Sequence, residues 1–443
     1  MASLVLVAIL VGTVVLQAVR PAYRLTVVLG GAALSCLAAA LFGVGTTRAI
    51  FADVPWDVLV LLVGLGFLTE LFVATRVFGV VAAKVTRLSR GGPKRIFLLF
   101  TLVMYVASSL VNNLTALLLV LPILLILFKL LGVGKKYLAW TLGVLLVACN
   151  LGGAATPIGD FPALLLLGRG VMTFTDYLMT AAPPTLVALA VLVGWTLLKV
   201  RPERELVRDP LTTRLSLAVM AALYRRVRLD WRRFLPAVGW LVAMLVAWLV
   251  VPPSSGVGPE LVCWLGVGAA LLSSPKVGEN IIRTRVDVEA ALFLLALFVM
   301  VAAVRQSGLF AAAGQGLAAL PIPAVVQLVL FLLAAGVLTG LFSAGPSMAA
   351  LLDVAEALAT RLPPAAVYVG LALSVCAGSS LFLTAATSGP MAQILTERAQ
   401  LTDEQGERVR FGFFEFLPVG LVAFAIIQTV AVGYALVLVV TRG

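Results

Sequence analysis

Long apolar runs are the feature that most constrains how this chain can fold. Hydrophobic residues fill 62% of its 443 positions, whereas charged residues fill only 12%. A soluble domain carries about 25% charged residues, so this chain has too little polar surface to stay dispersed in water. The composition therefore predicts an all-α polytopic membrane protein. It excludes a soluble enzyme, a disordered chain and a secreted disulfide scaffold.

The chain carries a basic excess of +12, which fits the positive-inside bias of membrane loops. No basic stretch stands apart from the apolar runs, so we expect no nucleic-acid partner. Histidine is absent from the sequence, which leaves carboxylates, hydroxyls, Lys or water for any proton-linked step. No metal-ligand spacing and no paired membrane carboxylates occur, so we expect neither an enzyme nor a cofactor other than a coupling ion.

A membrane helix requires about 20 mostly apolar residues. Two longer stretches, 96–131 and 325–358, carry polar residues at their midpoints. About 35 residues of helix would be ~50 Å long, too long for one crossing, so each stretch is expected to form a re-entrant hairpin. The remaining clear runs are Ala2–Leu16, Leu25–Phe42, Trp56–Thr75, Tyr137–Leu151, Tyr177–Leu198, Phe234–Val251, Leu261–Ser274, Val288–Val304 and Phe411–Val440.

The placement of basic residues supports this topology. With the N-terminus outside and each hairpin returning to its own side, 27 of the 32 Lys and Arg residues fall inside. Such asymmetry is typical of cytoplasmic loops. The sequence therefore predicts about ten spans and two hairpins in the cell inner membrane, with the N-terminus and C-terminus both outside.

The order of spans repeats once. A shift of 232 residues places Trp56 on Val288 and Thr115 on Ser347. Because each half has five spans, an odd number, the second half is inverted in the membrane relative to the first. Inverted repeats with broken helices are typical of secondary transporters. We expect the first repeat at 1–198, with a hairpin at about 94–131 and a broken helix at about 137–168. A basic cytoplasmic linker at 199–233, in contact with the lipid bilayer, precedes the second repeat at 234–443, with a hairpin at about 322–358 and a broken helix at about 365–396.

The most informative motif runs from Cys149 to Pro162 and holds three glycines, among them Gly152 and Gly153, and two prolines. Such a run disfavours a continuous helix, and unwound backbone at membrane depth is tolerated where it lines a cavity. Its freed carbonyls, with the side chains of Asn150 and Thr156, can bind a hard cation such as Na⁺. The alternative is a loop with a turn at the membrane surface.

Asp160 is the only acid in that motif. An intramembrane carboxylate is a candidate for binding a cation or carrying a proton. The alternative is a helix cap that accepts backbone N–H bonds. Among the other membrane acids, Asp353 is placed to face the transport pathway, whereas surface exposure is expected for Glu356.

Neutral polar groups gather at the midpoints of both long stretches. Such groups coordinate Na⁺, and exposed N–H groups at half-helix starts can hold an anion; the alternative is hydrogen bonding between helices. The first tip holds Ser108, Ser109, Asn112, Asn113 and Thr115. The second half offers Ser343 and Ser347 at its tip and Ser379, Ser380, Thr384 and Thr387 in its break, without an Asn or an acid there.

These motifs resemble the ion transporter superfamily. The resemblance rests on Ser and Asn-Asn-x-Thr in 108–115, followed by Gly-Gly-x-x-Thr-Pro-Ile-Gly-Asp in 152–160. That group includes D-type sodium/proton antiporters, divalent-anion/sodium symporters, citrate carriers, arsenite exporters and the P protein. The resemblance implies a scaffold domain, a transport domain that moves as an elevator, and a homodimer.

The resemblance also implies site residues. By carry-over, Ser108, Asn112, Asn113, Gly152 and Thr156 line a first cation site, with Na⁺ at Asn112, Gly152 and Thr156. Ser343, Ser347, Ser379, Ser380 and Thr384 occupy the matching second region. The Gly159-Asp160 pair is similar to the antiporter and P-protein version of the break. We therefore expect most of all a sodium/proton antiporter; the alternative is a sodium-coupled symporter or an exporter of an inorganic or carboxylate anion, of the citrate, sulfate or arsenite class.

Overall fold

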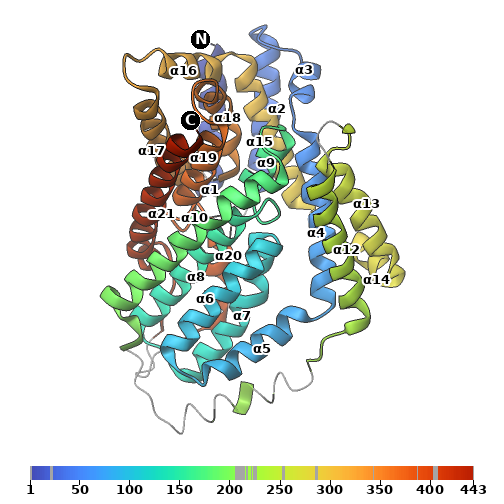
Figure 1. Cartoon of the computed structure of the whole chain (residues 1–443), viewed down its shortest axis with the longest axis vertical. Coiled ribbons are helices and arrows are strands. Elements are labelled where there is room, and N and C mark those ends of the chain that lie inside the picture. Colours follow the sequence, from blue (N-terminus) through green and yellow to red (C-terminus); the bar gives the residue numbers. More distant parts are fainter. Residues whose placement is uncertain are drawn as a thin grey trace.

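The structure is a computed structural model and describes residues 2–19, 23–204, 215, 218–220, 222, 227–251, 255–284, 288–342, 344–386, 388–402 and 408–442. Within these ranges the protein is a bundle of α-helices (Figure 1). The only extended pairing in these ranges is a single bridge between Thr402 and Arg408. The all-helical prediction is confirmed.

Among the described residues, eight helices are long and apolar enough to cross a membrane, or up to ten if each of two bent pairs counts as one span. The multi-pass prediction is therefore confirmed. The eight are α4 (Trp56–Ala74), α6 (Pro93–Leu110), α7 (Asn113–Leu131), α8 (Lys135–Ala155), α10 (Phe174–Trp195), α12 (Trp231–Val250), α17 (Ala324–Phe342) and α21 (Phe413–Arg442).

The two bent pairs lie in the second half of the chain. The chain bends by 119° between α13 (Pro259–Leu272) and α14 (Pro275–Thr284). It bends by 63° between α15 (Val288–Gln306) and α16 (Leu309–Ala318). The shorter helices are α1 (Ala2–Val19), α2 (Arg24–Leu41), α3 (Thr47–Ala52), α5 (Val77–Ser89), α9 (Phe161–Gly168), α18 (Ala344–Ala359), α19 (Pro364–Ser379) and α20 (Gly389–Ala399).

Helices α8 and α19 form the centre of the molecule. Nearly every residue of α8 from Tyr137 onward is buried, and so is every residue of α19 from Ala365 onward. A helix that is apolar on all sides must be covered on all sides. Accordingly α8 packs against α6, α7, α10 and α21, whereas α19 packs against α17, α18, α21 and α10. Both central helices end inside the bundle, at Ala155 and Ser379, and this places the two chain breaks in its interior.

Packing between the two halves of the chain is reciprocal. Helix α4 packs on α12 and α13, whereas α15 packs on α1 and α2; α9 packs on α18, and α20 packs on α7. Two short helices follow the same type of turn: α5 begins after Arg76 at φ 62°, and α16 begins after Gly308 at φ 75°. Figure 1 shows α5 and α16 at opposite ends of the molecule.

The break in the first half is shorter than the sequence predicted. Helix α8 continues through Cys149, Asn150, Gly152 and Gly153, and only Thr156–Asp160 leaves the helix before α9 begins. The glycines serve close helix packing, because a Cβ on Gly152 would lie 2.2 Å from the carbonyl oxygen of Tyr105 in α6. Glycine content alone therefore overestimated the length of the unwound backbone.

Candidate functional site

A buried polar cluster forms where α6, α7 and α8 meet. The hydroxyl of Ser108, in the last turn of α6, lies within hydrogen-bond distance of Oδ1 of Asn113 and of the carbonyl oxygen of Cys149, the latter 2.7 Å away, and its one proton serves either acceptor. The Cys149 thiol lies 3.2 Å from the carbonyl oxygen of Asn113. All three residues are buried. The predicted tip residues Ser108 and Asn113 thus contact the predicted break directly.

Asp160 completes this cluster from the break. Its Oδ1 accepts a hydrogen bond of 2.9 Å from the backbone N–H of Phe161, so it caps α9. Its Oδ2 accepts a hydrogen bond of 3.0 Å from Nδ2 of Asn113. The side chain is therefore both a helix cap and a member of the buried cluster, with only 9% of the residue exposed. Its second oxygen holds the α7 start against the break.

Two helix starts converge on this carboxylate. Asn112 is the N-cap of α7, with Oδ1 accepting from the N–H of Leu114 at 2.9 Å, and Asp160 is the N-cap of α9. Each helix start carries a partial positive charge, which favours negative charge at this point, whereas burial of the Asp160 carboxylate opposes it.

Close backbone packing fixes the break against α6. Thr156 donates from its hydroxyl to the carbonyl oxygen of Ser109 at 2.6 Å. A Cβ on Gly159 would lie 2.5 Å from the carbonyl oxygen of Ser108, and a Cβ on Gly153 would lie 2.3 Å from Oδ1 of Asn113. Real Cβ atoms do not approach so closely, so only glycine fits either position.

Candidate cation ligands are neutral oxygens. The last four carbonyls of a helix have no intrahelical partner, which in α8 applies to residues 152–155. Among these, the carbonyl of Ala154 accepts from the Tyr177 hydroxyl at 2.9 Å. Of the predicted Na⁺ ligands, Asn112 is the N-cap of α7, Gly152 lies in the last turn of α8, and Thr156 is the C-cap of α8.

A second contact joins the two breaks. Asn150 in α8 donates from Nδ2 to Oγ of Ser380 at 3.1 Å and to the carbonyl oxygen of Ser379 at 3.2 Å. Both serines donate through their hydroxyls to the carbonyl oxygen of Cys376. The structure thus joins the buried break residues of both halves through Asn150.

The other residues predicted for the second half divide into three groups. Ser347 in α18 is buried, and its hydroxyl has no hydrogen-bond partner among the described residues. Thr384 is exposed, so the buried cluster does not include it. Ser343 and Thr387 lie outside the described residues. In the first half, Thr115 is half-buried in the first turn of α7.

Sequence reasoning missed Ser388. This residue precedes α20, is fully buried, and its hydroxyl lies beside the thiol of Cys149 in α8. The available signal was its position immediately before Gly389-Pro390, because serine is a common residue at helix starts and proline is common in the first turn.

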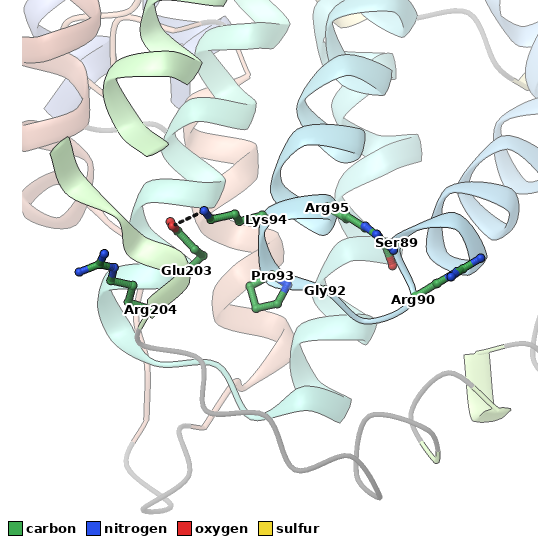
Figure 2. Close-up of a pocket in the computed structure, with 8 residues that line it drawn as sticks. All are labelled: Ser89, Arg90, Gly92, Pro93, Lys94, Arg95, Glu203 and Arg204. Carbon is green, nitrogen blue, oxygen red and sulfur yellow. Dashed lines mark ion pairs between the residues drawn. The ribbon is translucent and has the colours of Figure 1, made fainter. Parts of the chain in front are cut away.

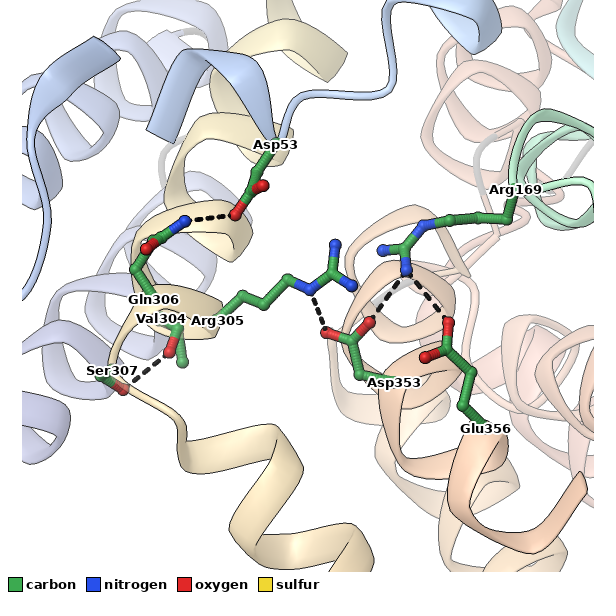
Figure 3. A network of polar contacts seen from close by, with 8 residues as sticks. All are labelled: Asp53, Arg169, Val304, Arg305, Gln306, Ser307, Asp353 and Glu356. Atoms are coloured by element: carbon green, nitrogen blue, oxygen red, sulfur yellow. Dashed lines mark hydrogen bonds and ion pairs between the residues drawn. The ribbon is translucent and has the colours of Figure 1, made fainter. Parts of the chain in front are cut away.

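A charged cluster lies apart from these breaks (Figure 3). Asp353 of α18 pairs with Arg169, which follows α9, at 3.0 Å and with Arg305 of α15 at 3.2 Å. Glu356 pairs with the same arginine at 3.2 Å. In this structure the Asp353 side chain is 8% exposed and held between two guanidinium groups, and its place in a transport pathway stays a prediction. Close by, Gln306 donates to Asp53.

Known proteins show similarity over most of the chain. The sequence model of a family described as citrate transporter matches residues 3–378. An uncharacterized transporter of Mycobacterium tuberculosis is 32% identical over 260 residues, 58% of each chain. The P protein of Homo sapiens is 31% identical over 134 residues, which are 30% of this chain and 16% of that one. The chain therefore covers little more than half the length of the first of these relatives.

A solved structure shares the fold. The Alcanivorax borkumensis YdaH transporter aligns with a TM-score of 0.57 at 17% identity, covering 91% of this chain and 88% of that one. At this identity the likeness concerns the arrangement of helices alone.

Proposed function

Because the chain belongs to the citrate transporter family, within the ion transporter superfamily, we propose that it is a secondary active transporter whose coupling cation binds at Asp160. The observation that carries the proposal is the position of this carboxylate. It is buried where a chain break meets the start of α7, and it is hydrogen-bonded to Asn113 through one oxygen. Intramembrane carboxylates in such positions are typical of ion and proton pathways.

The form of transport that this geometry supports best is sodium/proton antiport. A single carboxylate can bind either a proton or Na⁺, and binding of one excludes the other. Neutral oxygens complete the cation shell from Ser108, Asn112 and Thr156 and from the end of α8. Exchange then requires Asp160 to face each side of the membrane in turn.

The reciprocal packing supports two inverted repeats and alternating access between them. In this scheme α8 and α19, with the hairpins α6–α7 and α17–α18, move as one transport domain. The first two spans of each half, α1, α2, α12 and α13, form the scaffold and hold a homodimer together. The protein lies in the inner membrane with both termini outside, as its basic residues indicate.

The family match favours a second candidate, cation-coupled transport of a small anion of the citrate class. An anion would bind at the converging starts of α7 and α9, where N–H groups favour negative charge. Asp160 would then carry the coupling cation only, and the buried serines would orient the anion. Sulfate and arsenite are the other anions to compare.

Proteoliposomes with an internal pH dye separate the candidates. Sodium/proton antiport predicts that an imposed Na⁺ gradient moves protons without an added anion. Asp160→Asn abolishes that flux, whereas Glu397→Gln on the exposed face of α20 retains it. Proton flux that survives in Asp160→Asn contradicts both candidates. Accumulation of labelled citrate, sulfate or arsenite, with no Na⁺-driven proton flux in its absence, selects the anion carrier.

A further inference from the structure

A basic pocket lies at the corner where α5 ends and α6 begins (Figure 2). Its volume is about 620 Å³, within the roughly 300–1,000 Å³ typical of small-molecule sites. The end of α5 and the start of α6 form two of its walls, and a short 3₁₀ helix that follows α10, η3 (Pro202–Arg204), forms the third. The pocket is lined by Ser89, Arg90, Gly92, Pro93, Lys94, Arg95, Glu203 and Arg204.

The backbone at this corner is arranged to receive an anion. Arg90 ends α5 at φ 49° and Gly91 follows at φ 68°, so the chain reverses tightly and α6 starts at Pro93. The N–H groups of Lys94 and Arg95 lie in the first turn of α6 and have no intrahelical partner. Such a helix start attracts phosphate groups.

Charge in the pocket is strongly unbalanced. The residues that line the pocket include four basic side chains and one acid. Arg90, Arg95 and Arg204 are exposed and make no ion pair within the described residues. Figure 2 shows them spread along one row, with the Gly92–Pro93 turn in the middle. Among the described residues, the pocket therefore has a surplus of positive charge without an acidic partner.

Glu203, the one acid among the described residues that line the pocket, favours a ligand that also carries a hydrogen-bond donor. Glu203 reaches Lys94 at 3.5 Å through Oε1, and its side chain is only 8% exposed. Its Oε2 is buried and has no hydrogen-bond partner among the described residues. A buried carboxylate oxygen without a donor is costly, so a ligand that supplies a hydroxyl would satisfy it.

We propose that this pocket binds the headgroup of phosphatidylglycerol. The phosphodiester lies against Arg90, Arg95 and the start of α6, and a glycerol hydroxyl donates to Oε2 of Glu203. The source is the bilayer, because the pocket lies at the ends of the membrane helices α6 and α10, where headgroups are found. Bound lipid then fixes the end of α6 opposite to Ser108.

Native mass spectrometry of the full chain released from nanodiscs tests this site. The probes are phosphatidylglycerol, phosphatidylethanolamine and phosphatidylcholine. The triple variant Arg90→Gln, Arg95→Gln, Arg204→Gln should bind phosphatidylglycerol at least about tenfold more weakly, since each basic residue near an anionic surface contributes about a factor of five. The matched control Arg232→Gln, Lys276→Gln, Arg283→Gln removes the same charge from exposed positions on α12 and α14, away from the pocket, and should keep wild-type binding.

Two further comparisons, with phosphatidic acid and with inorganic phosphate, test which part of the ligand the pocket recognises. Glu203→Gln should lower the preference for phosphatidylglycerol over phosphatidic acid, which lacks the glycerol headgroup and its hydroxyls. Unchanged phosphatidylglycerol binding in the triple variant, or equal binding of the three probe lipids to the wild type, overturns the proposal. Displacement of the lipid by millimolar inorganic phosphate also overturns it, in favour of a free-phosphate site. Variants are compared only after their unfolding in phosphatidylcholine matches that of the wild type.

Discussion

Asn113 and Asp160, 47 residues apart, are joined by a hydrogen bond of 3.0 Å from Nδ2 to Oδ2. The amide of Asn113 faces Ser108 with its oxygen and Asp160 with its nitrogen, so the amide orientation is fixed by both neighbours. The start of α7 and the break between α8 and α9 therefore form one unit. A cation that binds to Asp160 must therefore disturb the hydrogen bond between Asn113 and Asp160.

Replacing Asn113 by Ala should destabilise the protein. The change leaves Oδ2 of Asp160 buried without its donor, which costs about 1–3 kcal/mol. Denaturation in detergent measures the loss. Asn280→Ala, on the exposed face of α14, is the matched control and should change stability by less than about 0.5 kcal/mol. Equal stability of the two variants would show that the Asn113–Asp160 bond contributes nothing.

A methyl group at position 153 should disrupt the cluster. Gly153→Ala places a Cβ 2.3 Å from Oδ1 of Asn113, and overpacking of this kind costs about 1–3 kcal/mol. Gly194→Ala in α10 meets open space and serves as control. Transport assays should show loss of activity only in Gly153→Ala. Full activity in both variants would mean that the cluster tolerates displacement of Asn113.

The contact between the two breaks should be measurable as a coupling energy. A double-mutant cycle with Asn150→Ala and Ser380→Ala isolates the hydrogen bond of 3.1 Å between them. A typical value is about 0.5–1.5 kcal/mol. Purely additive effects on the free energy of unfolding would contradict a direct interaction.

The charged cluster should stabilise the protein more than a surface ion pair does. Asp353→Asn removes one of the two acidic partners of Arg169 and the acidic partner of Arg305; the side chains of these arginines are 21% and 35% exposed. Since the arginines remain partly hydrated, the expected cost is about 1–3 kcal/mol, below that of a fully buried pair. The exposed pair Arg283–Glu279 in α14 provides the comparison, and Glu279→Gln should cost at most about 0.5 kcal/mol. Similar melting temperatures for Asp353→Asn and Glu279→Gln would show that the charged cluster stabilises the protein no more than the exposed ion pair does.

Hydrophobic run length predicted the helices well, because each apolar run must be buried or face lipid. Helix α4 begins at Trp56 and α15 at Val288, where the sequence placed their starts. Asn113 and Asp160 could be nominated because polar side chains are rare inside apolar runs. Their hydrogen bond could not be predicted, since it depends on how α7 and α9 pack.

Other features depend on neighbours that a single sequence does not reveal. Gly152 and Gly153 were assigned to an unwound segment, yet they lie in a helix whose partners allow no Cβ. Asp353 was assigned to the pathway because it follows the second tip by about two helical turns. Nothing local indicates its pairing with Arg169, which lies 184 residues away in sequence. Thr384 was included for its hydroxyl, although the structure leaves it exposed.

Proton release on Na⁺ addition tests most directly whether the coupling cation binds at Asp160. Purified wild-type protein in weakly buffered detergent should release protons in a saturable manner when NaCl is added, with choline chloride as blank. Asp160→Asn should release none, while Glu397→Gln releases as many as the wild type. Saturable proton release from folded Asp160→Asn protein would contradict the account.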